Sequence, residues 1–577
     1  MEKRMLRTQA TVFILLLAIS GFTPALAQFS GDGSGTEADP YIITDVVQLQ
    51  EISNDLDAHY ELGNDIDAAE TAEWNDGEGF EPIEGHFTGI FDGNGFTIAN
   101  LTIDRPDSAP VGLFAALGFD SKISNLGLED INYTGDGGIG GIAGVSHGLI
   151  VDSYATGSIT GTTPAIGGLV GNLNSAASIL DSFAEVNVTG GQSWVGGLAG
   201  LVSGEIINSH AIGNVTGGGR DVGGLVGDNQ GTITDSYATG NVDGDDNRVG
   251  GLVGRNHSVA TITNSFASGN VNGLGNFIGG MVGRNGGVII NGSATGDVTG
   301  DEAVGGLVGS NRNSAEIATS YATGEVFAGG GSGMVGGLAG INGGFIENSY
   351  ATGNISVEIG GFSGGLVGNN NGGEILNSYA AGIVDDTGFA GGLVGATDGE
   401  ITSTHWNTEV NPELDAVGFG FDEESGAVGS SSAQMMQQSS FLDWNFDDIW
   451  IITEGATYPW LRENPQDPPP SPDAATGVDS DNVPVEFVLN QNYPNPFNPV
   501  THIQFTLSER NDVILEIFNI IGQRVATLIN NENLSAGHHN VTWDATDQMG
   551  RRVSSGVYLY RLEAGSFIET KRMLFLQ

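Results

Sequence analysis

Apolar residues recur along the middle of the chain with a period far longer than a helical turn. The phrase GGLVGDNQGTITDSYATGNV, which begins at Gly223, shows the pattern: apolar or small residues alternate with polar ones, and Asp stands between two runs. The Gly-Gly pair that opens the phrase occurs ten times, at spacings of 26 to 31 residues. Repetition on this scale is typical of solenoids, in which each repeat buries its apolar face against its neighbours.

The apolar positions of one repeat predict short strands joined by a bend. Ala238, Gly240 and Val242 share parity, so one strand points all three toward a core. Ile233 has the opposite parity, which requires a bend, and Asp235 stands there with a side chain that suits turns. A helical alternative is excluded, because several glycines in each half-repeat would cost about 1 kcal/mol each.

The repeats predict an all-β protein, an elongated right-handed parallel β-helix of about eleven coils. An incomplete copy beginning at Val111 precedes the ten full copies, and a second short strand in each coil, Gly-Gly-Leu-Val-Gly, contributes a residue equivalent to Leu225. Eleven coils stacked at about 4.8 Å make a rod on the order of 50 Å long. Like residues should therefore form ladders along residues 111–405, the predicted solenoid.

One row, formed by Tyr237 and the equivalent residue of each other repeat, is irregular, since it contains Tyr, Phe, His and Ser. A Ser in place of a buried ring would leave a cavity costing roughly 3–5 kcal/mol, so we expect this row to be partly exposed. The row is either a stack of rings that stiffens one face or a platform on which sugar rings or peptides stack. The candidate ligand-binding residues are Tyr154, Tyr237, Tyr321, Tyr350 and Tyr379.

The repeated phrase resembles the GLUG motif, a repeat found in bacterial surface proteins, including adhesin-like ones. The resemblance covers roughly residues 137–405 and implies a surface protein. Ser236 stands where such repeats often have Cys, and the chain contains no Cys. Disulfides, thiolate catalysis and Cys-based zinc sites are therefore excluded.

The segments on either side of the repeats are expected to cap the solenoid, because an open coil leaves strand edges unpaired. Residues 28–110 resemble the N-terminal cap seen with this repeat. In them Asp45 and Gln48 resemble a capping box, and FDGNGFTI carries a hairpin-like turn. Residues 406–462 form the predicted C-terminal cap, with bulky side chains that close the last coil. A helical stripe of the first cap is Val46, Leu49, Ile52 and Leu56, and the bulky residues of the second are Trp406, Phe441, Trp444, Phe446, Trp450 and Trp460.

Residues 1–27 have the pattern of a secretory signal peptide: a basic start, an apolar run and a small-residue cleavage site. Cleavage is predicted between Ala27 and Gln28. No later stretch approaches the roughly 18 apolar residues that a membrane span needs. The expected location is extracellular or on the outer cell surface, after export through the periplasm and outer membrane.

Residues 463–482 form a Pro-rich linker, and residues 483–577 a separate small β domain. NYPNPFNP, FNIIGQRVATL and DQMGRRVSSGVYLYRL occur within the latter. It resembles the type A C-terminal sorting domain of the type IX secretion system. The resemblance implies an immunoglobulin-like β-sandwich that the secretion machinery recognises at the outer membrane, after which the protein is released or anchored.

Charge limits the possible partners. The net charge is −52, and residues 28–480 hold 59 acidic against 8 basic residues. Such a body repels nucleic acid and anionic membranes, so neither is an expected partner. The solenoid arginines each stand alone in their repeat, where an exposed solubilising charge is expected: Arg220, Arg248, Arg255, Arg284 and Arg312.

Little in the repeats suggests catalysis. His147, His257 and His405 are isolated, with no metal-ligand spacing, and the acidic pairs fall in variable loops without an insertion that would build a cleft. No enzymatic activity and no cofactor are expected. The loop with Asp243, Asp245 and Asp246 is a candidate calcium site, although it lacks the spacing of known calcium loops and a solvated loop is the alternative.

The predicted function is that of a secreted or cell-surface adhesin-like rod that binds an extracellular glycan or a surface protein. A passive spacer or matrix protein without a ligand is the first alternative. A polysaccharide-degrading β-helix enzyme is the second.

Overall fold

The computed structural model describes residues 29–464, apart from 330–332, 387 and 421–425, and parts of the chain between 466 and 575. The predicted signal peptide and its cleavage site lie outside the described residues, as does most of the predicted linker. The chain divides into two compact units, Met1–Gly477 and Val478–Gln577.

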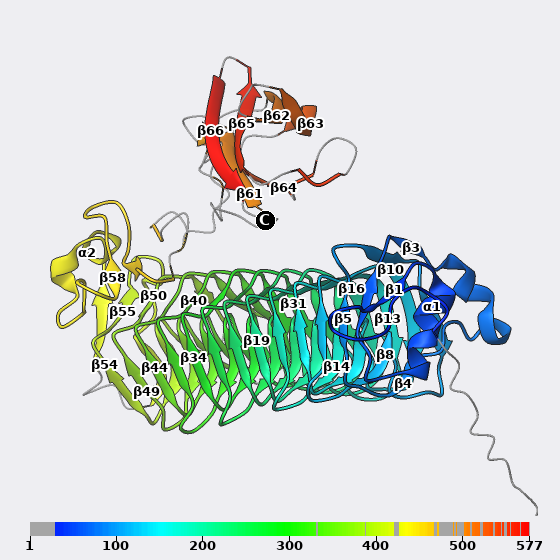
Figure 1. Ribbon diagram of the computed structural model, residues 1–577. Helices are drawn as coiled ribbons and strands as arrows, with labels where there is room; N and C mark the ends of the chain where they lie inside the picture. The colour runs from blue at the N-terminus through cyan, green and yellow to red at the C-terminus, as the bar shows by residue number, and fades with distance from the viewer. Residues whose placement is uncertain are drawn as a thin grey trace, which may run out of the picture. The chain divides into compact units, whose positions relative to one another are not determined.

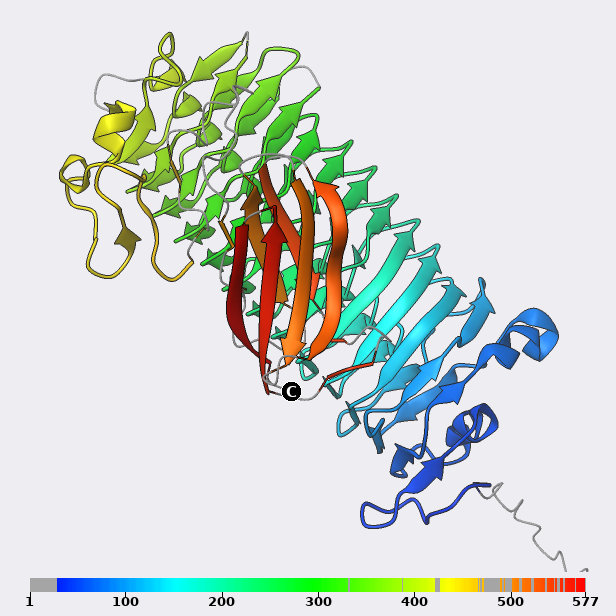
Figure 2. The same ribbon diagram turned by 90° about the horizontal axis from the view of Figure 1, so that it is seen from above.

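The first unit is a parallel β-solenoid, which confirms the predicted fold class (Figure 1). Like strands of successive coils pair in parallel, and Figure 2 shows these ladders from above. One ladder has 14 strands, a second has 13, from β4 (Ile83–Phe87) to β56 (Val417–Gly420), and a third has 8, from β17 (Val195–Gly196) to β52 (Phe389–Gly391). The 14-stranded ladder consists of β1 (Tyr41–Ile43), β2 (Tyr60–Leu62), β5 (Ile90–Asp92), β9 (Lys122–Ser124), β12 (Leu149–Val151), β15 (Ser178–Leu180), β19 (Glu205–Ile207), β24 (Thr232–Thr234), β29 (Thr261–Thr263), β34 (Val288–Ile290), β39 (Glu316–Ala318), β44 (Phe345–Glu347), β49 (Glu374–Leu376) and β54 (Glu400–Thr402).

A single coil shows how the repeat folds. It contains β22 (Val222–Gly223), β23 (Val226–Asn229), β24, β25 (Tyr237–Ala238) and β26 (Val242–Gly244). Leu225 is fully buried but lies in the corner between β22 and β23, and not within a strand as expected. The predicted bend at Asp235 is present, with a φ of 49° in the left-handed region that Asp and Asn tolerate best.

The inward-facing residues form the predicted ladders. Ile206, Ile233 and Ile262 are Cα partners in successive strands, and all three are fully buried. Ala238 and Val242 are buried on the same side of the chain, whereas Asn241 between them is exposed. The core is therefore a continuous stack of small and branched side chains along the rod.

Two buried polar ladders accompany the apolar ones, and sequence reasoning missed both. The serine before each ring accepts a hydrogen bond through Oγ from the backbone N–H of the preceding coil's serine, as from Ser209 N to Ser236 Oγ at 3.2 Å. A row of asparagines links side chain to side chain, as from Asn256 Nδ2 to Asn285 Oδ1 at 2.8 Å. The asparagine row is recognisable in the repeated VGDN, VGRN and VGSN, and consists of Asn229, Asn256, Asn285, Asn311, Asn342 and Asn370.

The expected N-terminal cap partly joins the coils. Helix α1 (Val46–Glu51) begins after Asp45, whose Oδ1 accepts a hydrogen bond from Gln48 N at 2.9 Å. The Gln48 side chain accepts from Thr44 N at 2.7 Å and not from Asp45, so the predicted capping box is only half formed. The 13- and 14-stranded ladders exceed the eleven expected coils, because parallel pairing begins within the predicted cap, at β4 in the first and at β1 in the second.

The predicted hairpin in FDGNGFTI is absent. Strands β5 and β6 (Thr97–Ala99), on either side of this turn, belong to different parallel ladders. Asn94 in the turn has a φ of 54°. The turn is therefore one corner of a coil, and an Asn-Gly signal that is common in hairpins serves here to change the direction of the chain.

The C-terminal cap contains α2 (Ser432–Met435), β58 (Trp450–Ile451) and β59 (Trp460–Leu461). Trp406 lies in the solenoid core, where it pairs in register with Ala380 and ends the alanine ladder. The sequence predicts that the other large residues close the end of the rod. They pack on its side instead. Phe441, Trp444 and Trp450 are buried there, and Phe446 and Trp460 are half-buried against them.

The second unit is a β-sandwich, as predicted. A three-stranded sheet of order β60-β61-β64 and a four-stranded sheet of order β63-β62-β65-β66 enclose one apolar core. Neighbouring strands within each sheet are antiparallel. The strands are β60 (Val488–Leu489), β61 (Thr501–Leu507), β62 (Asn511–Asn519), β63 (Arg524–Leu534), β64 (Gly537–Trp543), β65 (Gly556–Ala564) and β66 (Phe567–Phe575).

Candidate functional site

The row of aromatic residues is a stack whose rings face one another. The centroids of Tyr154 and Phe183 lie 4.9 Å apart with parallel planes, and those of His210 and Tyr237 lie 4.5 Å apart at 5°. The first ring lies over Gly127, where an added Cβ would stand 2.7 Å from a ring atom of Tyr154. Because neighbours occupy both faces of the rings from Tyr154 to Tyr237, these rings offer their edges, and the expected platform for stacking sugars needs correction there.

The C-terminal part of the same row is buried. Tyr350 and Tyr379 have no exposed surface, and Tyr321 is 6% exposed. Trp450 lies with its ring centroid 6.1 Å from that of Tyr350, and Tyr379 Oη donates a hydrogen bond to Pro459 O at 2.8 Å. Burial raises the pKa of the Tyr350 and Tyr379 hydroxyls well above the ordinary value of 10. The prediction that the whole row is partly exposed is therefore wrong for these three tyrosines.

The Ser that interrupts the row is also buried, at 5% exposure of Ser293. Residues 462–464, here called the strap, lie beside it as the chain leaves the cap. Asn464 Nδ2 donates to Gly292 O at 3.1 Å, and Asn291 Nδ2 donates to Glu463 Oε2 at 3.4 Å. Ser is therefore tolerated because another part of the chain covers this position, and not because the position is open to solvent.

The N-terminal part of the row stays accessible. Tyr154, Phe183, His210 and Tyr237 are half-buried, and Phe266 is 39% exposed. Tyr154 Oη donates a hydrogen bond to Glu129 Oε1 at 2.7 Å. Burial in the stack lowers the pKa of His210 to about 4 and raises that of Tyr237 to about 12. His210 is therefore neutral at pH 7.

A groove of about 490 Å³ lies beside these accessible rings. Its size falls within the range of sites that hold small ligands. The residues that line it lie two to four positions after a ring or a ring-equivalent residue, so the ring row runs along one flank of the groove. They are Asp130, Thr156, Gly157, Glu185, Asn187, Ile212, Gly213 and Asn214.

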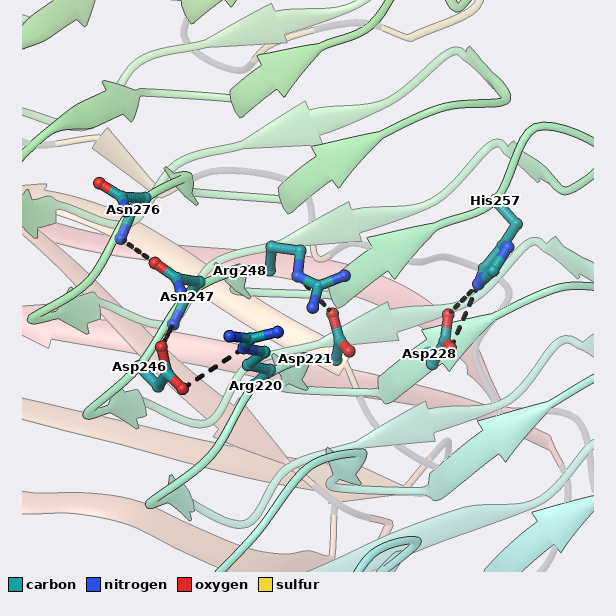
Figure 3. A network of polar contacts seen from close by, with 8 residues as sticks. All are labelled: Arg220, Asp221, Asp228, Asp246, Asn247, Arg248, His257 and Asn276. Carbon is teal, nitrogen blue, oxygen red and sulfur yellow. Dashed lines mark hydrogen bonds and ion pairs between the residues drawn. The ribbon is translucent and has the colours of Figure 1, made fainter.

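Two of the five arginines expected to stand alone, Arg220 and Arg248, form ion pairs across coils (Figure 3). Arg248 Nε lies 3.0 Å from Asp221 Oδ1, with side-chain exposures of 11% and 4%. Arg220 Nε lies 3.6 Å from Asp246 Oδ2. Burial raises the pKa of Asp221 to about 6, although the positive charge of Arg248 opposes the shift. The sequence does not reveal these ion pairs, because each Arg is separated from its Asp partner by about one coil of the chain.

The histidines likewise have partners. His257 Nε2 lies 2.9 Å from Oδ1 of the buried Asp228. His405 Nδ1 is 3.0 Å from Ser430 Oγ, and burial lowers the pKa of His405 to about 4. His147 lies on the ring of Phe119, with centroids 4.7 Å apart. Each of these three histidines therefore contacts a neighbouring side chain and does not stand isolated.

The candidate calcium loop does not gather its aspartates. Asp246 faces Arg220, as described above, and Asp243 Oδ1 accepts a hydrogen bond from Asn272 Nδ2 at 3.3 Å. Asp245 is exposed. Across the described residues, no three His, Asp or Glu side chains come together as metal ligands would. Asp243, Asp245 and Asp246 are therefore not arranged around one point in this structure, and calcium binding by this loop stays a prediction.

Comparison with protein families supports both units. Residues 218–243, 245–272, 300–326 and 331–356 match the GLUG motif, and residues 498–566 match the FlgD Ig-like domain. The chain thus carries GLUG repeats, as the sequence resemblance indicated. The match of the second unit is to an Ig-like domain, and its assignment to type IX secretion stays a prediction.

Similar proteins share only part of the chain. Halomucin of Haloquadratum walsbyi is 44% identical over 155 residues, which are 26% of this chain and 2% of halomucin. A protein of Evansella cellulosilytica, named as a Gly-rich membrane protein, is 33% identical over 147 residues, 24% of this chain and 17% of that protein. The chain thus spans a small fraction of these relatives.

Among solved structures, PorZ of Porphyromonas gingivalis, a surface component of the type IX secretion system, matches 18% of this chain and 13% of its own. The identity is 19% and the TM-score 0.13. No helix in the described part of the chain has the length and apolar character needed to cross a membrane.

Proposed function

We propose that this protein is an extracellular rod of the adhesin type, which stands at the cell surface and presents a lateral binding face. The observation that carries the proposal is the continuous stack of parallel ladders in the solenoid beside an accessible groove. Every coil continues the same buried ladders, so the rod is a stiff support. The groove and the accessible rings lie together on one face, where a large partner can reach them.

The comparisons support the location. GLUG repeats and a glycine-rich relative named as a membrane protein favour a role at the cell surface. The similarity to halomucin favours a structural or binding role over catalysis. Because the matched segments are 2% and 17% of these relatives, the surface location and the binding role are proposals for this chain.

Adhesion tests the binding role. Beads coated with the full chain should retain cells or extracellular polymer, whereas beads coated with an unrelated protein of similar acidity should not. Equal retention by both kinds of bead would favour the alternative of a passive spacer. Release of soluble fragments from a polysaccharide by the purified chain would instead show that the protein is an enzyme.

Export is a separate part of the proposal. We propose that residues 1–27 direct the chain to the periplasm and that residues 483–577 direct it through the outer membrane by the type IX secretion system. A chain lacking residues 483–577 should then accumulate in the periplasm of the producing cell. As a control, a chain lacking residues 237–265, one complete coil, should still reach the surface. Surface display of the first variant would contradict this route.

A further inference from the structure

The groove beside the rings crosses four successive coils. Asp130 lies on β10 (Gly127–Gly135), Thr156 on β13 (Tyr154–Gly161) and Glu185 on β16 (Phe183–Gly190). Asn214 lies between the two short strands of the fourth coil, β20 (His210–Ala211) and β21 (Val215–Gly217). Four coils at about 4.8 Å give a groove that extends roughly 14 Å along the rod. It therefore fits a linear segment better than a compact molecule.

The groove exists because the backbone changes shape at this point. β10 pairs with β13 through a register shift between Leu128 and Ile131, so the chain bulges at Asp130. In the fourth coil the long strand breaks at Gly213, where an added Cβ would lie 2.0 Å from the carbonyl oxygen of Val186. A side chain there would displace backbone of the preceding coil, so glycine is required where the strand breaks.

The amides in the groove are held as hydrogen-bond donors. Asn187 Oδ1 accepts from Asn214 N at 3.2 Å, and Asn214 Oδ1 accepts from Asn241 N at 3.0 Å. These bonds use the carbonyl oxygen of each side chain and fix its orientation, which leaves the NH₂ group to donate. Both asparagines are exposed, so these donors face solvent.

The carboxylates supply the matching acceptors. Asp130 and Glu185 are exposed, and neither is in an ion pair within the described part of the chain. No Lys, Arg or His lines the groove. An anionic ligand would therefore meet two negative charges and no positive one, in a protein whose net charge is −52.

We propose that this groove binds a segment of a neutral, polyhydroxylated polymer, that is, an uncharged glycan chain. A hydroxyl group both donates and accepts, so vicinal hydroxyls use the carboxylates and the amides together. The cationic side chains of a basic peptide only donate, so they would use the carboxylates and not the NH₂ donors of Asn187 and Asn214. The edges of the Tyr154, Phe183 and His210 rings form an apolar flank for the sugar ring. This inference rests on the proposed binding function and names its ligand class.

Asn187→Asp tests the groove with minimal disturbance. The new carboxylate keeps the oxygen that accepts from Asn214 N but replaces the NH₂ donor with an acceptor. Asn241→Asp is the matched control, because Asn241 Oδ1 accepts from Asn270 N at 3.0 Å in the same row but outside the groove. Binding of neutral oligosaccharides to the full chain, measured by calorimetry, should weaken at least tenfold with Asn187→Asp and stay unchanged with Asn241→Asp.

A second pair of variants removes an acceptor charge. Glu185→Gln should weaken binding, while Glu205→Gln, an equal charge change at an exposed position on another ladder, should not. Oligosaccharides with uronate or sulfate groups and a Lys-rich peptide serve as probes of other ligand classes. Stronger binding of either than of neutral oligosaccharides would overturn the ligand class.

The outcomes separate this inference from the proposed function. Adhesion and neutral-glycan binding that survive Asn187→Asp and Glu185→Gln would overturn the groove as the site but leave the adhesin proposal intact. Loss of adhesion together with loss of glycan binding in both variants would support the two proposals at once. Failure of the unaltered chain to bind any glycan would overturn the inference, and adhesion to cells would then decide the proposed function alone.

Discussion

The two halves of the aromatic row place rings at the same position of the same repeat, yet they differ in what surrounds the rings. The rings from Tyr154 to Phe266 stack on one another and keep exposed edges. The rings from Tyr321 to Tyr379 also stack, with centroids 4.9 to 5.1 Å apart, but the cap covers them. Trp450, whose ring centroid lies 6.1 Å from that of Tyr350 and 6.2 Å from that of Tyr379, is fully buried among them.

This difference shows that the position of a residue in the repeat does not by itself determine whether the residue is buried. The coil sets the direction of each side chain and the stacking distance to the next. Residues about a hundred positions later decide whether solvent reaches the ring. Trp450 is held beside the row by the hydrogen bond that its Nε1 donates to Asn348 Oδ1 at 3.3 Å. The accessible rings of the binding surface and the rings beneath the cap therefore come from the same position of the repeat.

The largest expected effect breaks the covered half. Tyr350→Ala removes a fully buried ring between two other tyrosines and beneath Trp450, which should cost about 3–5 kcal/mol. Hydrogen exchange should report faster opening of the cap and of the last coils, with little change near Tyr154. A uniform change along the rod would contradict the local role of the cap.

The boundary between the halves is tested by filling it. If Ser293 is a gap in the ring stack, Ser293→Tyr should complete the stack and stabilise the protein. Because the strap lies beside this rung, we expect instead that the new ring displaces the strap and destabilises the cap by about 1–3 kcal/mol. Proteolysis after Arg462 should then increase. Ser293→Ala, which adds no bulk, should leave the cleavage rate as it is.

Acid should sharpen the comparison, because each half contains a histidine whose pKa is lowered by its surroundings. The folded-state pKa of His210 is lowered from 6.5 to about 4, so below pH 6.5 the unfolded chain binds a proton that the folded chain does not. Stability is lost as pH falls from about 6.5 to 4, by up to about 3 kcal/mol. His210→Phe keeps a ring in the stack and should remove this part of the loss.

Denaturation at pH 7.5 and 4.5 measures the effect. His405, in the covered half, has a pKa lowered to about 4 by burial, so its acid sensitivity remains when His210 is replaced. The difference between the two pH values should therefore shrink in His210→Phe but not vanish. An unchanged difference would mean that the accessible half lets a charged His210 reach water.

The smallest effect is expected at the exposed end of the accessible half. Phe266→Ala removes a ring that is 39% exposed and stacks on a single neighbour, Tyr237. The loss should be about 0.5–1.5 kcal/mol, the range for one aromatic pair. Thermal unfolding of the full chain measures it beside Tyr350→Ala. Equal losses for the two variants would mean that the cap contributes nothing to the ring row.

The sequence predicts what the repeat itself determines. Alternation at Ala238 and Val242, the bend at Asp235 and the isoleucine ladder follow from local chemistry and from repetition, and the structure confirms each. The buried asparagine row was visible as a recurrent Asn before a glycine-rich turn, but its bonds run between coils and not along the chain.

The parts that sequence reasoning missed depend on contacts between distant segments. Nothing near Tyr350 indicates that Trp450 covers it, and nothing near Ser293 indicates the strap. The groove arises where strand geometry changes between coils, at the bulge by Asp130 and the break at Gly213. Such changes follow from how unequal repeats stack, which no single repeat reveals.

The strap also limits how this protein can change in length. Its contacts with Asn291 and Gly292, and those of the cap with Asn348 and Tyr379, fix the number of coils between Ser293 and the end of the rod. A duplication within that span would move the cap away from the residues that it contacts. A gene duplication or deletion of one coil between Tyr237 and Ser293 would only lengthen or shorten the ladders. Natural variation in rod length is therefore expected on the N-terminal side of Ser293.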